Sequence, residues 1–150
     1  MKGKIQSLES RAQTGTEIYQ SAAFYPDLGN HIDTTLTQFF NFVKNIPYIE
    51  DMDRAELISR PKYLLHRRNF AGLDCKKKAT LIGAWLNAHG LIPGKDWHLV
   101  AISERPDKEI HHVFVQARFN KQWKNLDPTY PEYKIFDPKP NVTNAEILLP

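Results

Sequence analysis

The chain has 150 residues, of which 41% are hydrophobic and 25% are charged, and its formal net charge is +3. These values are typical of one soluble globular domain that is long enough to bury a core. The small positive charge does not by itself indicate nucleic-acid binding. The single cysteine excludes a disulfide within the chain, so the sequence favours a reducing compartment.

The N-terminus begins basic, but no apolar run follows it. The sequence therefore predicts no signal peptide and no membrane-spanning helix, and we expect a cytoplasmic protein. Residues 1–30 are polar, with scattered apolar positions, and they predict a weak helix and then a loop that ends near residues 26–30. We expect this region to be a polar arm, loosely attached to a domain that spans residues 31–150.

Two helical segments are expected before the cysteine. The first begins after Asp33 or Thr34, and Pro47 ends it. Its apolar stripe at helical spacing consists of Leu36, Phe39, Phe40 and Val43. The second segment covers residues 52–59 and ends before Pro61, because the residue that precedes a proline disfavours the helical conformation.

The clearest helix of the sequence runs from Cys75 to His89. Asp74 precedes it as a candidate N-cap, whose carboxylate can accept from the free N–H groups of the first turn. Gly90 stands where a left-handed residue ends a helix. The apolar face of this helix carries the cysteine, so we expect the thiol at the buried N-terminal edge of a core helix.

The second half of the chain predicts an antiparallel sheet. Strands are expected over residues 97–102, 110–119 and 122–127. Asn120 and Lys121, between the last two strands, have the length of a two-residue hairpin turn. The tail from Pro128 is rich in proline, and we expect it to be irregular, with a short extended piece over residues 133–136.

The hairpin register places a histidine and a carboxylate on one face of the sheet. Residues directly opposite each other in an antiparallel pair point to the same side. With a two-residue turn, Phe119 lies opposite Gln122, and Phe114 lies opposite Asp127. His112 is then one diagonal step from Asp127, roughly 5–8 Å between Cβ atoms. A change of one residue in the turn would put them on opposite faces.

A cysteine at a helix start, a strand histidine and a carboxylate, in this order, are the layout of an activated thiol nucleophile. The positive end of a helix dipole favours a thiolate. We expect His112 to form an ion pair with Cys75 and to protonate the leaving group, while Asp127 orients the imidazole. The backbone N–H of Cys75 is a candidate oxyanion donor. The candidates for further substrate or oxyanion contacts are Tyr48, Asn69 and Asp74.

Three motifs resemble the core of the transglutaminase-like superfamily, which shares a papain-like fold. They are Gly72-Leu73-Asp74-Cys75 at the helix start, His112-Val113-Phe114-Val115 on a strand, and Trp123-Lys124-Asn125-Leu126-Asp127-Pro128-Thr129 on the next strand. The lead-in at residues 46–51 is also similar, and the likeness covers about residues 34–130. The resemblance implies an α+β fold in which the nucleophile helix packs on an antiparallel β-sheet.

By this resemblance, the protein is expected to cleave or form amide bonds through a thioester. Members of the superfamily include proteases, transglutaminases, deamidases and peptide glycanases, and small stand-alone forms are encoded by bacteriophages and bacteria. The resemblance implies a catalytic triad of Cys75, His112 and Asp127, a protein or peptide substrate, and no cofactor or metal. We favour hydrolysis over acyl transfer. Family members often have acidic residues after the cysteine, whereas this chain has Lys76, Lys77 and Lys78.

Other interpretations of the same residues stay open. A non-catalytic structural module, for example a bacteriophage virion component with assembly partner proteins, would keep the fold without turnover. Zinc would use side chains from the set Cys75, His98, His111, His112 and Asp127, although the sequence has no short-spaced ligand pair of the usual kind. His111 competes with His112 as the base, but it shares a strand face with apolar residues. The lysine run is more typical of a solvated face than of a nucleic-acid site.

Overall fold

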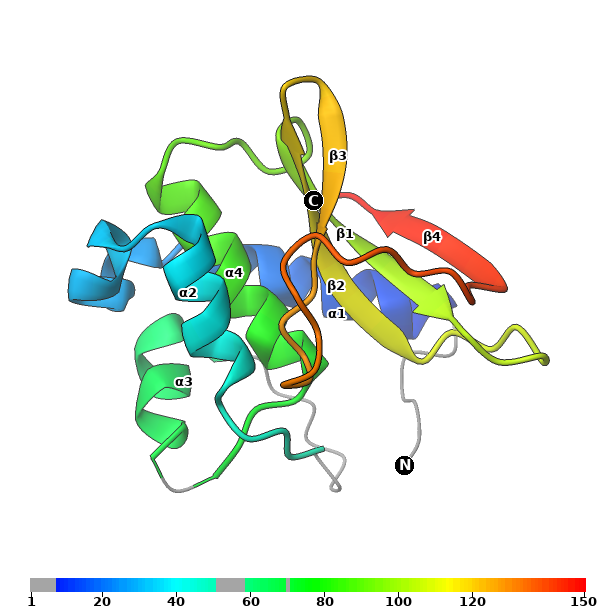
Figure 1. Cartoon of the computed structure of the whole chain (residues 1–150), viewed down its shortest axis with the longest axis horizontal. Helices are drawn as coiled ribbons and strands as arrows, with labels where there is room; N and C mark the ends of the chain where they lie inside the picture. Colours follow the sequence, from blue (N-terminus) through cyan, green and yellow to red (C-terminus); the bar gives the residue numbers. More distant parts are fainter. Residues whose placement is uncertain (1–7, 51–58, 70) are drawn as a thin grey trace.

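Figure 1 shows the computed structural model of the chain, in which several helices gather around one central helix beside a twisted sheet. The structure describes residues 8–50, 59–69 and 71–150. The helices are α1 (Leu8–Ala22), the 3-10 helix η1 (Tyr25–Asp33), α2 (Leu36–Lys44), α3 (Pro61–Arg67) and α4 (Cys75–Ala88). The strands are β1 (Trp97–Ser103), β2 (His112–Phe119), β3 (Gln122–Leu126) and β4 (Asn144–Leu148).

The four strands form one antiparallel sheet in the order β3-β2-β1-β4. The central helix α4 contacts α1, α2 and α3 as well as β1 and β2, and α1 also contacts β4 directly. The sheet residues in the main core are Trp97, Leu99, Ala101, Val113, Val115, Ala117, Leu126 and Leu148. Their alternation along β1 and β2 gives the sheet one face toward the helices, as period-two patterning predicts.

The ends of α4 follow the predicted capping residues. Asp74 accepts a hydrogen bond from the N–H of Lys77 (3.0 Å) at the N-terminus. At the other end, Gly90 has φ 84°, and the N–H of Leu91 donates to the carbonyl of Leu86 (3.0 Å). This is a Schellman arrangement, which a left-handed glycine allows. From residue 75 to residue 86 the helix is buried on all sides. By contrast, the sequence predicts that only one face is buried.

The N-terminal region is more firmly attached than its polar composition suggests. In α1, Ile18, Tyr19 and Ala22 are buried in the main core. The Tyr19 hydroxyl donates to the carbonyl of Leu148 (2.5 Å) and accepts from the N–H of Leu99 (2.9 Å). The expectation of a loosely attached arm is therefore wrong for residues 8–30, because three apolar residues on one helix face are enough to dock it. The loop expected after this helix is the 3-10 helix η1.

The tail also differs from its expected irregular course. Residues 144–148 form β4, which pairs antiparallel with β1 at the edge of the sheet. The expected extended piece at 133–136 is instead a turn, in which the N–H of Lys134 donates to the carboxylate of Asp137 (2.8 Å). The helix expected over 52–59 lies outside the described residues, except for Ser59.

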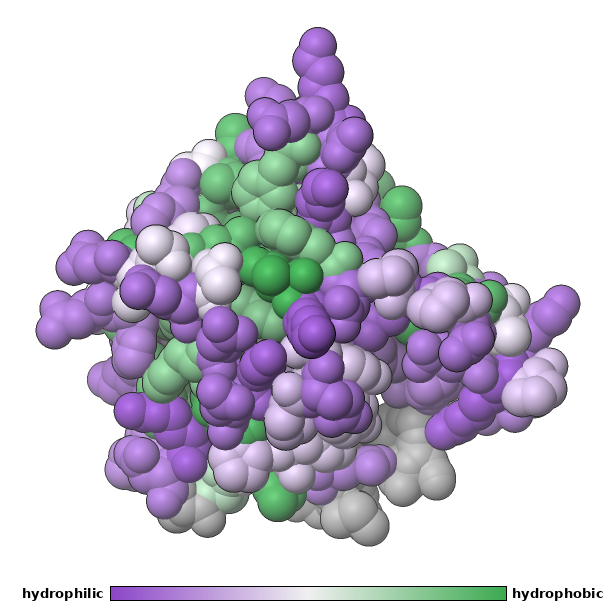
Figure 2. All heavy atoms as spheres, viewed as in Figure 1, coloured by the Kyte–Doolittle hydropathy of each residue, from purple (hydrophilic) through white to green (hydrophobic). Residues whose placement is uncertain are grey.

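The surface in Figure 2 is mainly hydrophilic, with apolar side chains gathered near the centre of this face, between the helices and the β2–β3 hairpin. Within the described residues, no helix combines the length and the apolar character that crossing a membrane requires.

Candidate active site

Cys75 is the first residue of α4, and the backbone before the helix fixes its position. The N–H of Leu73 donates to the carbonyl of Pro47 (3.0 Å), and the N–H of Ile49 donates to the carbonyl of Leu73 (3.4 Å). Gly72 approaches this segment so closely that a Cβ would lie 2.1 Å from the carbonyl oxygen of Pro47. The chain therefore enters α4 along one path and leaves Cys75 buried, with 7% of its surface exposed.

The β2–β3 hairpin has the register that the sequence predicts. Phe119 pairs with Gln122 across the turn. Asn120 and Lys121 have φ values of 52° and 66°, which are typical of a two-residue type I′ turn. Because the turn has two residues, His112 and the residue that follows β3 at position 127 point to the same side of the sheet.

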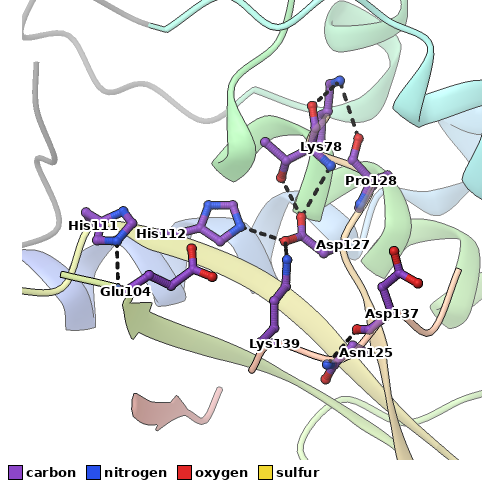
Figure 3. Close-up of polar contacts among 10 residues, drawn as sticks. Lys78, Glu104, His111, His112, Asn125, Asp127, Pro128, Asp137 and Lys139 are labelled. Carbon is purple, nitrogen blue, oxygen red and sulfur yellow. Dashed lines mark hydrogen bonds and ion pairs between the residues drawn. The ribbon is translucent and has the colours of Figure 1, made fainter. Parts of the chain in front are cut away.

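His112 and Asp127 are in direct contact. The Nε2 atom of His112 lies 2.7 Å from Oδ2 of Asp127, and both side chains are buried (Figure 3). The thiol of Cys75 lies near enough to this imidazole to contribute to the raised pKa of His112. Since Nε2 faces the carboxylate, Nδ1 is the ring nitrogen left for the thiol. The three residues that the sequence singles out are thus brought together in the order thiol, imidazole and carboxylate.

The electrostatics of this trio favour a protonated imidazole. Burial by itself lowers the pKa of His112, but the charge and the hydrogen bond of Asp127 outweigh it and, together with Cys75, raise that pKa to about 10. Burial also opposes the charge of Asp127, yet His112 and Lys139 hold the pKa of Asp127 well below its usual range. The histidine and the carboxylate therefore form an imidazolium–carboxylate pair at neutral pH.

The carboxylate of Asp127 has further partners that the sequence motifs do not reveal. Its Oδ1 atom accepts from the hydroxyl of Thr129 (2.5 Å) and from the N–H of the same residue (3.2 Å). Its Oδ2 atom, which faces His112, also forms an ion pair with the Nζ atom of Lys139 (2.5 Å). The threonine belongs to the recognised motif, but nothing in the tail sequence marks the lysine as part of the site.

The three lysines after the cysteine are buried, so the expected solvated face is wrong. The ammonium groups of Lys76 and Lys77 lie 3.0 and 3.7 Å from Oδ2 of Asp74. Lys78 is fully buried, and its Nζ atom donates to the carbonyls of Ile46 (2.6 Å) and Thr129 (2.9 Å). The run is accommodated because a buried carboxylate and free backbone carbonyls take the place of water.

Asp74 serves the helix rather than a substrate. Burial raises its pKa, but the charges of Lys76 and Lys77 and the N–H of Lys77 lower it more strongly, so the net pKa shift is downward. An ionised carboxylate accepts hydrogen bonds and does not donate them. Asp74 is therefore a helix cap and the counter-ion of two lysines, and it does not fit the role of an oxyanion donor.

A cavity of about 190 Å³ lies beside His112. Its lining residues are Tyr48, Glu50, Glu104, Arg105, His111, His112, Tyr130 and Tyr133. Tyr48 is held there by a backbone bridge to Leu73, and burial, together with the neighbouring Cys75, raises its pKa above that of an ordinary phenol. Asn69, in contrast, is exposed beyond the end of α3 and does not line this cavity.

The other histidines have their own partners. His111 accepts a hydrogen bond from the N–H of Glu104 through Nε2 (3.0 Å), and burial and Arg105 lower its pKa. His98 lies 2.9 Å from the amide of Gln116. Within residues 8–50, 59–69 and 71–150, no group of three or more His, Cys, Asp or Glu side chains is arranged to hold a metal ion.

No family model matches the chain, and no curated protein matches it. Among solved structures, the chain is similar to Legionella pneumophila LapG in its calcium-bound form, with 15% sequence identity and a TM-score of 0.55. The match covers 88% of this chain and 80% of the LapG chain. At this identity the likeness concerns the fold. The fold is transglutaminase-like. The predicted α+β class, in which the helix that begins at Cys75 packs on an antiparallel sheet, is confirmed.

Proposed function

We propose that the protein is a thiol hydrolase that cleaves amide bonds, with Cys75 as the nucleophile, His112 as the acid and base, and Asp127 as the group that orients His112. The observation that carries this proposal is the position of His112, which is buried between the thiol of Cys75 and the carboxylate of Asp127.

The proposed reaction follows from these contacts. The thiolate of Cys75 attacks the carbonyl carbon of an amide, a C–S bond forms, and the carbonyl electron pair moves onto oxygen. When the tetrahedral intermediate collapses, the C–N bond breaks and the imidazolium of His112 gives its proton to the leaving amine. The neutral imidazole then takes a proton from water, whose oxygen attacks the thioester. The C–S bond then breaks, the acid product leaves, and the thiolate and the imidazolium are restored.

Two groups near the thiol are suited to stabilise the oxyanion. The N–H of Cys75 is at the first helical position, where no carbonyl four residues earlier belongs to the helix. Tyr48 lines the cavity beside His112, and its raised pKa keeps the hydroxyl protonated at neutral pH. We assign Tyr48 as the second donor in preference to Asn69. Hydrolysis by water that enters the cavity beside His112 would need no second substrate site, which favours it over acyl transfer.

The test is the alkylation of Cys75 by iodoacetamide, followed by mass spectrometry, which gives one signal because the chain has one cysteine. At pH 6 a free thiol is almost entirely protonated and reacts slowly. We expect the native protein to react at least about tenfold faster than His112→Ala, because general acid–base and ion-pair effects of this kind are of order 10²-fold or more. His111→Ala is the matched control and should stay within about twofold of the native rate.

Equal rates in the native protein and in His112→Ala would overturn the proposal and leave a non-catalytic module that keeps the fold. A loss of rate in His111→Ala instead of His112→Ala would move the role of base to the neighbouring ring. If the expected pattern is found, the native protein should cleave members of a peptide library. The Cys75→Ala variant should fold normally and cleave none of them.

A further inference from the structure

The carboxylate of Asp127 is shared between two cations at a single oxygen. Oδ2 lies 2.7 Å from Nε2 of His112 and 2.5 Å from Nζ of Lys139, as Figure 3 shows. The side chains of all three residues are at most 9% exposed. The other oxygen, Oδ1, is occupied by the hydroxyl and the N–H of Thr129. Thr129 therefore fixes the carboxylate through Oδ1, and Oδ2 is shared between the two cations, His112 and Lys139.

Lys139 is delivered to this oxygen by a tail that is fixed on the sheet. The side chain of Asn125 donates to the carbonyl of Asp137 (3.0 Å), and the N–H of Phe136 donates to the carbonyl of Asn125 (3.1 Å). Gln116 on β2 donates to Oδ1 of Asn125 (2.8 Å), which orients that amide. The tail is thus anchored two residues before Lys139.

The aromatic rings around the ammonium group complete its site. The Nζ atom of Lys139 lies 4.0 Å from the ring centroid of Tyr133 and 5.4 Å from that of Phe114. A cation over an aromatic face is attracted by the ring quadrupole, most strongly where water is excluded. These contacts hold the ammonium group of Lys139 at the carboxylate of Asp127, and they do not depend on His112.

We propose that Lys139 is a positioning residue of the site, which takes part of the charge of Asp127 and thereby sets the pH at which His112 gives up its proton. The catalytic meaning of this role rests on the function proposed above, but the electrostatic effect does not. In a buried site of low effective dielectric, a cation on the shared oxygen repels the imidazolium and weakens its pairing with the carboxylate. Loss of Lys139 should therefore make His112 hold its proton more tightly.

Other titratable groups also act on this pair. They are Cys75 and Lys78 on α4, His111 beside His112, Tyr130 and Tyr133 in the segment after β3, and Glu50, Glu104 and Arg105 around the cavity. These groups are present in every variant, so a difference between variants follows from the change at Lys139.

The experiment is a titration of His112 by NMR, using protein labelled with ¹⁵N in its histidine rings, in native protein, Lys139→Met and Lys139→Arg. We expect the midpoint of His112 to rise by about one pH unit in Lys139→Met, which is the usual effect of one close charge, and to return toward the native value in Lys139→Arg. Lys134→Met removes an exposed cation from the same tail and should leave the midpoint unchanged. If Lys139→Met does not fold, Lys139→Gln takes its place as the neutral variant.

An unchanged or lowered midpoint in the neutral variant would overturn the inference, as would a rise of the same size in Lys134→Met. The result is independent of turnover. Alkylation of Cys75 that does not depend on His112, together with a raised midpoint, would overturn the proposed function and leave this inference standing. Alkylation that depends on His112, together with an unchanged midpoint, would do the reverse.

Discussion

Figure 3 shows two lysines in the neighbourhood of Asp127, and they are held by different kinds of group. Lys78, on α4, donates to the backbone carbonyls of Ile46 and Thr129. Lys139, in the tail, pairs with the carboxylate of Asp127 itself. Carbonyls supply dipoles without net charge, so burial lowers the pKa of Lys78 to about 8, although Asp127 opposes this shift. The first lysine joins backbone segments, and the second acts on the charge of the site.

The largest expected effect is that of Lys78→Ala on folding. The substitution leaves several buried carbonyls without a donor and opens a cavity between α4 and the segments at residues 44–46 and 128–129. We expect the free energy of unfolding to fall by about 3 kcal/mol. Urea unfolding followed by circular dichroism measures this change. Lys62→Ala, at an exposed position of α3, is the control, and an equal loss in both variants would remove the distinction between the two lysines.

A pH titration of stability separates Lys78 from its neighbours. Its pKa is about 8 in the folded protein and about 10.4 in an unfolded chain. Between these values the unfolded state binds more protons, so the contribution of Lys78 to the free energy of unfolding grows as pH rises and is smallest below pH 8. His112 has the opposite sign, because its folded pKa is raised, and its contribution is lost as pH rises through about 10.

The comparison of native protein with Lys78→Met isolates the lysine, since His112 is present in both. From pH 7 to pH 9.5, we expect the native protein to gain about 1–2 kcal/mol relative to Lys78→Met. Urea unfolding at the two pH values measures this gain. A constant difference would mean that Lys78 keeps its proton in the folded state across this range.

The contrast between the lysines also explains how much of the site could be predicted from the sequence. The contact between His112 and Asp127 follows from strand alternation and a two-residue turn, which are local rules. The cap at Asp74 is equally local. These rules, together with the three motifs, predict the fold class and the trio with Cys75. They contain no information on which distant backbone carbonyls or cations will meet the same carboxylate.

The residues that sequence analysis missed depend on long-range packing. The ammonium group of Lys78 is buried because the segments at residues 46 and 129 pass over α4, and a run of three lysines by itself indicates a solvated surface. Lys139 reaches Asp127 because Asn125 anchors the tail, in a region whose prolines predict irregular structure. The tail also supplies β4, although the prolines before residue 141 predict irregular structure for the whole tail. A polar or irregular segment can therefore supply the charge that tunes a site.

The smallest expected effect is that of Thr129→Val, which tests whether the two lysines act through one connected unit. Thr129 meets both: its carbonyl accepts from Lys78, and its hydroxyl donates to Oδ1 of the carboxylate that pairs with Lys139. Valine keeps the shape and the carbonyl but removes the hydroxyl, so we expect a loss of about 1 kcal/mol in the free energy of unfolding, which Thr129→Ser should largely restore.

Double-mutant cycles then assign the effect of this hydroxyl to one lysine. Because the carbonyl of Thr129 is unchanged, Thr129→Val should add to Lys78→Met within about 0.5 kcal/mol. With Lys139→Met it should couple more strongly, since both substitutions loosen the same carboxylate of Asp127. The reverse result would be additivity with Lys139→Met and coupling with Lys78→Met. It would mean that the backbone and α4 position the carboxylate of Asp127, and that Lys139 does not help to position it.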